Sequence, residues 1–305
     1  MLMSAVESYL SLRRSLGFRL KETGYQLHSF AQFSGDRSEQ LIRTATAVEW
    51  AGLGTSPPQR ARLLGVVIRF ARYLHAEDQR HEIPPEGVYG SENRPRPTPF
   101  IFSPEQVQQL LAAASGLRPR GSLRPYTYVT LFSLLACTGL RVSEAIRLTF
   151  ADLTADGLLI RESKFRKSRL VPLHETARSG LELYLARRRL LVGESDRLFV
   201  SERGQSLRYD HVARAFRTSL RRSGLDRESA RRQPSLHSLR HTFAVRALEN
   251  CPEGRDQISR HTLALSSYLG HYKVASTYWY LEATPCLLSD IAESCERFVT
   301  QGERQ

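Results

Sequence analysis

Residues 126–148 read YTYVTLFSLLACTGLRVSEAIRL and carry the clearest pattern of the chain. Apolar side chains recur at helical spacing, which predicts a helix over residues 126–136 that ends before Gly139. Arg141 and Glu144 then lie three residues apart at the start of a second helix, so their side chains share one face. The carboxylate can hold the guanidinium group ready for bidentate contact with a phosphate. This motif alone nevertheless favours the alternative of a solvated surface pair.

The residues around this stretch predict a mainly α-helical fold with a small antiparallel β-sheet (α+β). Residues 157–160 and 169–173 are short β-type runs on either side of the basic turn SKFRKS, a pattern typical of a hairpin. Upstream, IFSPEQVQQLLAAA predicts a helix with Ser103 as its N-cap and Pro104 at its first position. Further helices are expected over residues 176–190, 209–222, 237–249, 263–269, 273–281 and 286–299.

A linker is predicted over residues 82–99, because HEIPPEGVYGSENRPRPTP holds five prolines, two glycines and no apolar periodicity. It divides the chain into a first domain, residues 1–81, and a second domain, residues 100–305. Helical periodicity in the first domain covers residues 5–16, 22–33 and 60–74. We therefore expect it to be a small domain of four or five helices.

The charge of the chain points to a polyanionic partner. The formal charge is +13, of which residues 1–98 carry +3 and the remainder +10. A hydrophobic content of 41% excludes a disordered polyelectrolyte. The four cysteines form no CxxC pair, so neither a zinc ribbon nor a disulfide framework is indicated. Without a signal peptide or an apolar stretch of membrane length, the chain is expected to be soluble and cytoplasmic, with no membrane partner.

Five polar clusters follow one another in the second domain, and each contains a group that can bind or protonate a phosphate oxygen. They are CTGLRVSE (137–144), SKFRKSR (163–169), HSLRH (237–241), LGH (269–271) and STYWY (276–280). Each cluster is a weak signal, but their order and spacing resemble the tyrosine recombinase (phage integrase) family. The resemblance covers residues 99–299 by motif. The first domain resembles the core-binding domain of that family by architecture alone.

The resemblance implies a site-specific DNA recombinase that cuts and rejoins DNA through a covalent 3′-phosphotyrosine intermediate. A type IB topoisomerase or a telomere resolvase would use the same chemistry on one duplex and is the nearest alternative. A non-catalytic DNA-binding accessory protein is an alternative of another class, although every catalytic position of the family is occupied. A basic helical scaffold with no DNA role is the third alternative, which the ordered motifs disfavour.

The nucleophile implied by the resemblance is Tyr280, because it is the ninth residue after His271. Tyr278 is the rival, whereas Tyr272 lies too close to the histidine. A helix through this segment would place Tyr278 and Tyr280 about 200° apart, so both cannot face one phosphate.

By the same resemblance, Arg141 and Arg240 hold the non-bridging oxygens of the scissile phosphate and stabilise the pentavalent transition state. Glu144 supports Arg141. His237 and His271 complete the site, and either is a candidate for proton exchange with the tyrosine hydroxyl.

Lysine is rare in this chain, since 40 of its 44 basic residues are arginines, yet two of the four lysines lie in the hairpin turn. The leaving 5′ oxygen needs a proton, and an ammonium group donates one more readily than a guanidinium. Alignment of RLVPL with the family turn places the catalytic lysine at Lys164. Ser163 and Phe165 stand where glycines are common, so Lys167 stays open as the alternative.

Two histidines are not expected to be catalytic. His241 is interpreted as structural or solvent-facing. His261 lies in ENCPEGRDQISRHT (249–262), which is interpreted as an inserted loop that lengthens the spacing between Arg240 and His271. The resemblance implies no metal and no cofactor, and the sequence offers no convincing ligand cluster.

The implied partner is double-stranded DNA, bound by a dimer on one site and by a tetramer in the synapse. The amphipathic segment 286–299 is expected to dock on a neighbouring protomer. YWYLEATP (278–285) resembles the corresponding segment of recombinases carried by transposons and integrative elements. Such an enzyme would work in the cytoplasm, associated with the nucleoid.

Overall fold

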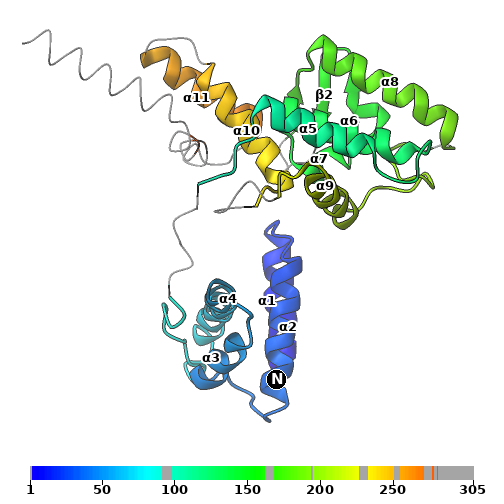
Figure 1. Ribbon diagram of the computed structural model, residues 1–305. Helices are drawn as coiled ribbons and strands as arrows, with labels where there is room; N and C mark the ends of the chain where they lie inside the picture. Colours follow the sequence, from blue (N-terminus) through cyan, green and yellow to red (C-terminus); the bar gives the residue numbers. More distant parts are fainter. Residues whose placement is uncertain are drawn as a thin grey trace, which may run out of the picture. The chain divides into compact units, whose positions relative to one another are not determined.

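The chain folds into two compact units, 1–96 and 97–305, in a computed structural model (Figure 1). The structure describes residues 2–90, 98–161, 168–193, 195–226, 233–250, 255–270, 277 and 280. Most of these residues are helical, and three short strands form an antiparallel sheet. The expectation of a mainly α fold with a small sheet is therefore confirmed. No helix within the described ranges has the length and apolar character that a membrane span needs.

The first unit is built from helices that bury one apolar face each. They are α1 (Leu2–Ser15), α2 (Lys21–Gly35), α3 (Thr44–Gly52) and α4 (Pro57–His75). Helix α4 contacts each of the other three, and its buried side chains recur at helical spacing. Phe30 of α2 meets Trp50 of α3 edge to face, with ring centroids 5.4 Å apart.

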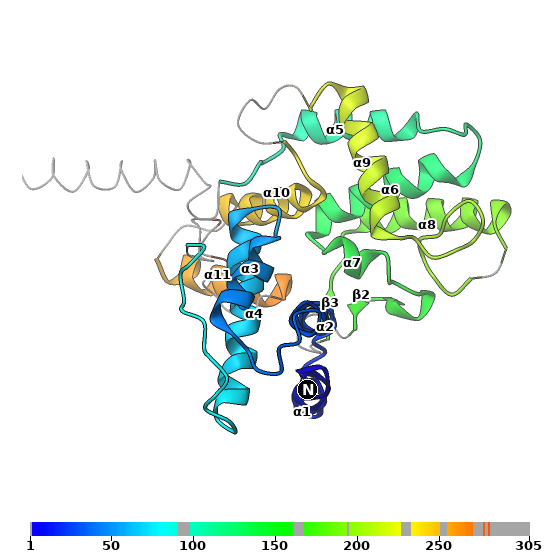
Figure 2. The same ribbon diagram turned by 90° about the horizontal axis from the view of Figure 1, so that it is seen from below.

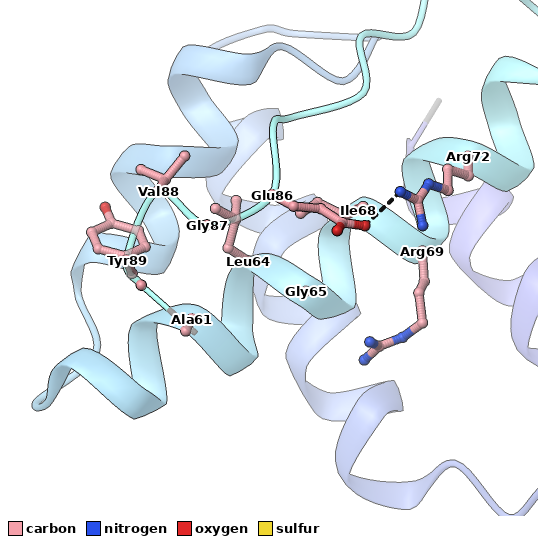
Figure 3. Close-up of a pocket in the computed structure, with 11 residues that line it drawn as sticks. Ala61, Leu64, Gly65, Ile68, Arg69, Arg72, Glu86, Gly87, Val88 and Tyr89 are labelled. Carbon is pink, nitrogen blue, oxygen red and sulfur yellow. Dashed lines mark hydrogen bonds and ion pairs between the residues drawn. The ribbon is translucent and has the colours of Figure 1, made fainter. Parts of the chain in front are cut away.

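Residues 82–90 differ from the expected linker because they pack against the first unit. The hydroxyl of Tyr89 donates to Val48 O at 2.7 Å, and Glu86 pairs with Arg72 of α4 at 2.6 Å (Figure 3). A pocket of about 580 Å³ lies between this segment and α4. The first half of the proline-rich stretch thus belongs structurally to the helices before it.

The second unit packs around the long helix that was predicted over residues 126–136. Its helices are α5 (Pro104–Ser115), α6 (Leu123–Thr138), α7 (Val142–Ala145), α8 (Glu175–Leu191), α9 (Tyr209–Ser223), α10 (Leu236–Glu249) and α11 (Arg255–Leu269), with a 3₁₀ turn η1 (Phe150–Asp152). Helix α6 contacts α5, α8, α9 and α10, and Figures 1 and 2 both show α8 running beside it. Phe132 of α6 meets Phe216 of α9 edge to face at 5.4 Å within the core. The expected cap of α5 is confirmed, since the Ser103 side chain accepts from the backbone of Gln106.

The predicted hairpin is present, with one short additional strand. Strands β1 (Leu153–Thr154), β2 (Gly157–Ile160) and β3 (Arg169–Val171) pair in the order β1-β2-β3. Residue 169 lies opposite Ile160, and Val171 lies opposite Leu158. Strand β3 stops at Val171 because the next residue, Pro172, has no N–H to donate. Arg169 and Val171 therefore project from the same face of β3.

The interpretation of residues 249–262 as a loop is wrong for its second half, where α11 begins at Arg255. Residues 255–261, RDQISRH, hold a single apolar side chain, so apolar periodicity gives no signal over the first turns of α11. Of the helix expected at 273–281, the structure describes only residues 277 and 280, and the segment 286–299 lies outside the described residues.

Candidate active site

The turn that follows α6 positions Arg141, the first arginine of the site. Gly139 closes α6 with a φ of 60°, a left-handed conformation that suits glycine. A Cβ at this position would lie 2.4 Å from Cδ1 of Phe243 on α10, so the turn also requires a residue that has no side chain. This tight passage brings Arg141 to the N-terminus of α7, close to α10.

Arg141 and Glu144 form a buried pair, which excludes the interpretation as a solvated surface pair. Arg141 Nη1 donates to Glu144 Oε1 at 2.7 Å, and the Arg141 backbone N–H donates to Oε2 at 3.0 Å. The Glu144 side chain is only 2% exposed. Arg141 Nη2 donates to the carbonyl of Gly270 at 3.1 Å, which joins α7 to the end of α11.

Arg169 of β3 is a site residue that the sequence reasoning did not identify. Its Nη1 and Nη2 donate to the two oxygens of Glu144 at 3.2 and 2.8 Å, and its Nε donates to Tyr268 O at 2.7 Å. Burial favours a raised pKa for Glu144, but the hydrogen bonds and charges of Arg169 and Arg141 lower that pKa to about 2. Glu144 is therefore a carboxylate that bridges two guanidinium groups. The signal available in the sequence was a charged residue on the inward face of a strand.

Arg240 lies deeper than the other two arginines. It is 2% exposed on α10, and it donates to Gly139 O at 2.6 Å and to Leu269 O at 2.7 Å. Burial, followed by the positive charge of Arg141, lowers the pKa of Arg240 to about 10. The guanidinium group thus stays charged at neutral pH.

His237 lies one turn before His241 on α10, and it is exposed. The rings of the two histidines meet edge to face, with centroids 4.4 Å apart. Desolvation of the imidazole by surrounding protein, followed by the charges of Arg240 and Arg141, lowers the pKa of His237 to about 4. His237 is therefore neutral at pH 7 and can exchange a proton on the side that faces solvent.

His241 contacts the tyrosine that the sequence indicates as the nucleophile. Tyr280 Oη lies 3.2 Å from His241 Nδ1, and the two rings are 5.4 Å apart. Tyr280 is 2% exposed and packs in an apolar cluster with Val245, Leu248 and Leu265. The interpretation of His241 as structural or solvent-facing therefore missed its most informative contact. Its position one helical turn after His237 was the available signal.

His261 has a structural contact, since its Nε2 donates to the carbonyl of Ala247 at 2.6 Å and ties α11 to α10. Four of the expected site residues or their rivals, Lys164, Lys167, His271 and Tyr278, lie outside the described residues. The choice between the two lysines stays a prediction.

The described site carries an excess of positive charge. Arg141, Arg169 and Arg240 approach one another around the single carboxylate of Glu144. The arrangement is suited to an anion with several oxygens, such as a phosphodiester. Among the described residues, no group of histidine, cysteine, aspartate and glutamate has the arrangement of a metal site.

Clustered arginines and a histidine beside a tyrosine hydroxyl are suited to phosphoryl transfer through a covalent intermediate. Residues 101–285 match the family described as "Phage integrase family". The relative named integrase/recombinase y4rB, from Sinorhizobium fredii (strain NBRC 101917 / NGR234), is 39% identical over 96% of each chain. The tyrosine recombinase XerD of Brucella abortus biovar 1 (strain 9-941) is 32% identical over 75% of this chain and 73% of its own. The chain belongs to the phage integrase family.

Solved structures share the fold at lower sequence identity. The XerH site-specific recombinase in a post-cleavage complex with difH DNA superposes with a TM-score of 0.67 at 19% identity, over 90% of this chain and 78% of that chain. The Tn1549 transposon integrase bound to transposon right-end DNA gives a TM-score of 0.66 at 16% identity, over 96% and 98% of the two chains. The chain is therefore a tyrosine recombinase, an enzyme of site-specific DNA recombination that breaks and rejoins DNA. The topoisomerase, telomere-resolvase and accessory-protein alternatives are not favoured by these matches.

Proposed function

We propose that Tyr280 is the nucleophile of this recombinase and that the reaction passes through a covalent 3′-phosphotyrosine. The observation that supports this assignment most directly is the approach of the Tyr280 hydroxyl to α10, the helix that carries His237 and Arg240. Arg240 also experiences the charge of the Tyr280 oxygen when that group ionises. The positive charge of Arg240 favours the ionised form of a neighbouring phenol, whereas burial opposes it.

In the proposed cleavage step, the Tyr280 oxygen forms a bond to the phosphorus of a DNA phosphodiester, and the bond from phosphorus to the 5′ oxygen breaks. Arg141 and Arg240 hold the non-bridging oxygens while charge accumulates on them. The phenolic proton passes to His237 or His271, and the leaving 5′ oxygen receives a proton from Lys164. The freed 5′-OH of one duplex then attacks the phosphotyrosine of the partner duplex, so no external energy source is needed.

The nucleophile is tested by capture of the covalent adduct. Cells that express the protein are lysed in detergent, DNA attached to the protein is sequenced, and the recovered site is rebuilt as a nicked duplex. The parent and Tyr278→Phe should both form the adduct on this duplex, whereas Tyr280→Phe should form none. The reverse result for the two tyrosines would move the nucleophile to Tyr278.

The proton donor is tested with a duplex in which sulfur replaces the bridging 5′ oxygen. A thiolate leaves without protonation, so this duplex restores cleavage to a variant that lacks the general acid. Lys164→Ala should cleave the ordinary duplex slowly and the sulfur duplex at close to the parent rate. Lys167→Ala serves as the matched control, because it removes the same charge from the same turn. Rescue of Lys167→Ala alone would assign the proton donor to Lys167.

We propose that the units have separate roles, with the first unit, including the packed segment 82–90, as a core-binding domain and residues 100–305 as the catalytic domain. Double-stranded DNA is the proposed partner, with a dimer on one site and a tetramer in the synapse. Lambda integrase supports this stoichiometry by its likeness in fold, since its structures include a dimer on a core site and a tetramer on a Holliday junction. A chain that stops after residue 285 should bind DNA but form no tetramer in sedimentation experiments, if segment 286–299 docks on a neighbour. Tetramers of the shortened chain would contradict that role.

We propose that the biological role is integration or transposition of a mobile element, carried out in the cytoplasm at the nucleoid. The resemblance in fold to a transposon integrase supports this role. The sequenced adducts decide it, because they should lie at the ends of an element. Adducts at a single chromosomal site without an element would indicate chromosome-dimer resolution instead.

A further inference from the structure

The C-terminal end of α11 is held by three arginines from three different elements. Arg169 of β3 donates to Tyr268 O at 2.7 Å, Arg240 of α10 to Leu269 O at 2.7 Å, and Arg141 of α7 to Gly270 O at 3.1 Å. The last carbonyl groups of a helix have no partner within the helix and carry partial negative charge. Three consecutive carbonyls at this helix end are thus bound by guanidinium groups.

Arg169 has a different position in this arrangement from the other two arginines. All three of its nitrogens donate to protein atoms, two to Glu144 and one to Tyr268 O, and its side chain is 12% exposed. Arg141 is more open, with 24% of its side chain exposed. Arg169 is therefore engaged with protein, while Arg141 keeps a surface that can face a phosphate.

The backbone at Gly270, after the end of α11, packs closely against the Arg169 guanidinium group. Gly270 has a φ of 66°, and a Cβ there would lie 3.0 Å from Arg169 Nη1. A side chain at residue 270 would press on the guanidinium group while the backbone occupies a left-handed conformation. The strand, the carboxylate and the helix end thus form one packed set around Arg169.

We propose that Arg169 is a positioning residue that aligns the phosphate-binding arginines with the end of α11, and so with His271, the next residue of the chain. It acts on Arg141 through Glu144, the carboxylate that both arginines share. It also joins β3, which follows Lys164 in the sequence, to α11, which precedes His271 in the sequence. This role rests on the proposed function, because Arg141, Lys164 and His271 act there on the scissile phosphate.

Loss of Arg169 should change how cleavage depends on pH. The groups around the Glu144 carboxyl are Arg141 from α7, Arg169 from β3 and Arg240 from α10, with Tyr268 of α11 on the far side of Arg169. Burial favours the neutral form of Glu144, whereas the hydrogen bonds and charge of Arg169 favour the ionised form. Without Arg169, the pKa of the Glu144 carboxyl therefore rises from about 2. Protonated Glu144 no longer holds Arg141 by charge, so cleavage falls on the acidic side.

The test uses the full chain, the nicked duplex recovered by adduct sequencing, and three variants. Arg169→Gln should lower the single-turnover rate of adduct formation by about 10- to 100-fold, a loss expected for a small displacement of reacting groups. Its affinity for the duplex, measured by fluorescence anisotropy, should change by less than about threefold, because phosphate contacts dominate that affinity. Its rate should also fall at acidic pH where the parent rate is flat. Arg169→Lys should recover part of the rate, since an ammonium group keeps the charge but cannot span Glu144 and Tyr268 O.

Arg178→Gln is the matched control, because Arg178 also donates to backbone carbonyls beside the sheet, at Thr154 and Ala155. It should cleave like the parent at every pH. A parent-like rate and pH profile for Arg169→Gln would overturn the proposal. If circular dichroism shows that Arg169→Gln does not fold, Arg169→Lys decides, and a parent-like rate and profile for it would also overturn the proposal. Failure of the proposed function is distinct, since the parent would then form no adduct or Tyr280→Phe would still form one.

Discussion

Replacement of Gly139 by alanine should destabilise the second unit by about 2–5 kcal/mol. A non-glycine residue with a φ near 60° costs about 1–2 kcal/mol. The new Cβ would also lie 2.4 Å from Cδ1 of Phe243, so the ring must move within the packed space between α6 and α10. Such overpacking costs about 1–3 kcal/mol more. The carbonyl of Gly139 accepts from Arg240, so the same change should disturb the proposed phosphate-binding site.

Gly224→Ala is the control for the backbone contribution. Gly224 ends α9 with a φ of 79°, and a Cβ there would meet nothing within 4 Å. It should therefore cost only the backbone part, about 1–2 kcal/mol. Urea unfolding followed by far-ultraviolet circular dichroism measures both variants. In a Trp279→Phe background, Trp50 is the sole tryptophan, and its fluorescence transition should stay unchanged because it reports the first unit. Equal losses for the two glycine variants would refute the steric reasoning.

Three further predictions concern protons and salt. Glu144 has a folded pKa of about 2 against 4.5 for the ordinary carboxyl, so its contribution of about 3 kcal/mol is present above pH 4.5 and is lost as pH falls toward 2. Urea unfolding of Glu144→Gln should show a flatter acid slope than the parent, and equal slopes would contradict the buried pair. His237 has a pKa lowered from 6.5 to about 4, so the unfolded chain binds the proton first and stability falls as pH drops from 6.5 to 4. His237→Asn should lose this part of the slope, and an unchanged profile would argue against a neutral histidine. DNA affinity should fall by about 10³–10⁵ between 50 and 200 mM salt for 6–10 phosphate contacts, as anisotropy titrations can measure. A weak salt dependence would exclude a phosphate-dominated interface.

Local patterns in the sequence were sufficient to predict much of the fold. The apolar run before Gly139 predicted α6, and the turn chemistry at residue 103 predicted the start of α5. The first turns of α11 were missed because residues 255–261, RDQISRH, hold a single apolar side chain and so show no apolar periodicity. A contact that holds this part of the helix, from His261 to the Ala247 carbonyl, joins residues of different helices, which no local pattern indicates.

The same distinction applies to the site. The pair of Arg141 and Glu144 is three residues apart, so helical geometry alone predicts their contact. The burial of that pair depends on Arg169, which is 25 residues from Glu144, and no local rule indicates the contact. His241 was assigned a structural role because nothing near it in sequence shows that Tyr280, 39 residues later, lies against its ring.

The capping of α11 has a consequence for the order in which the site is completed during synthesis. All three arginines precede the carbonyls that they bind, by 29, 99 and 129 residues. A ribosome therefore releases every donor before it releases the first acceptor. A chain interrupted before residue 268 would contain Arg240 in a buried position without the Leu269 carbonyl that it binds in the folded chain. An incomplete translation product of this kind holds the three arginines without the helix end that they bind, and it also lacks Tyr280, the proposed nucleophile.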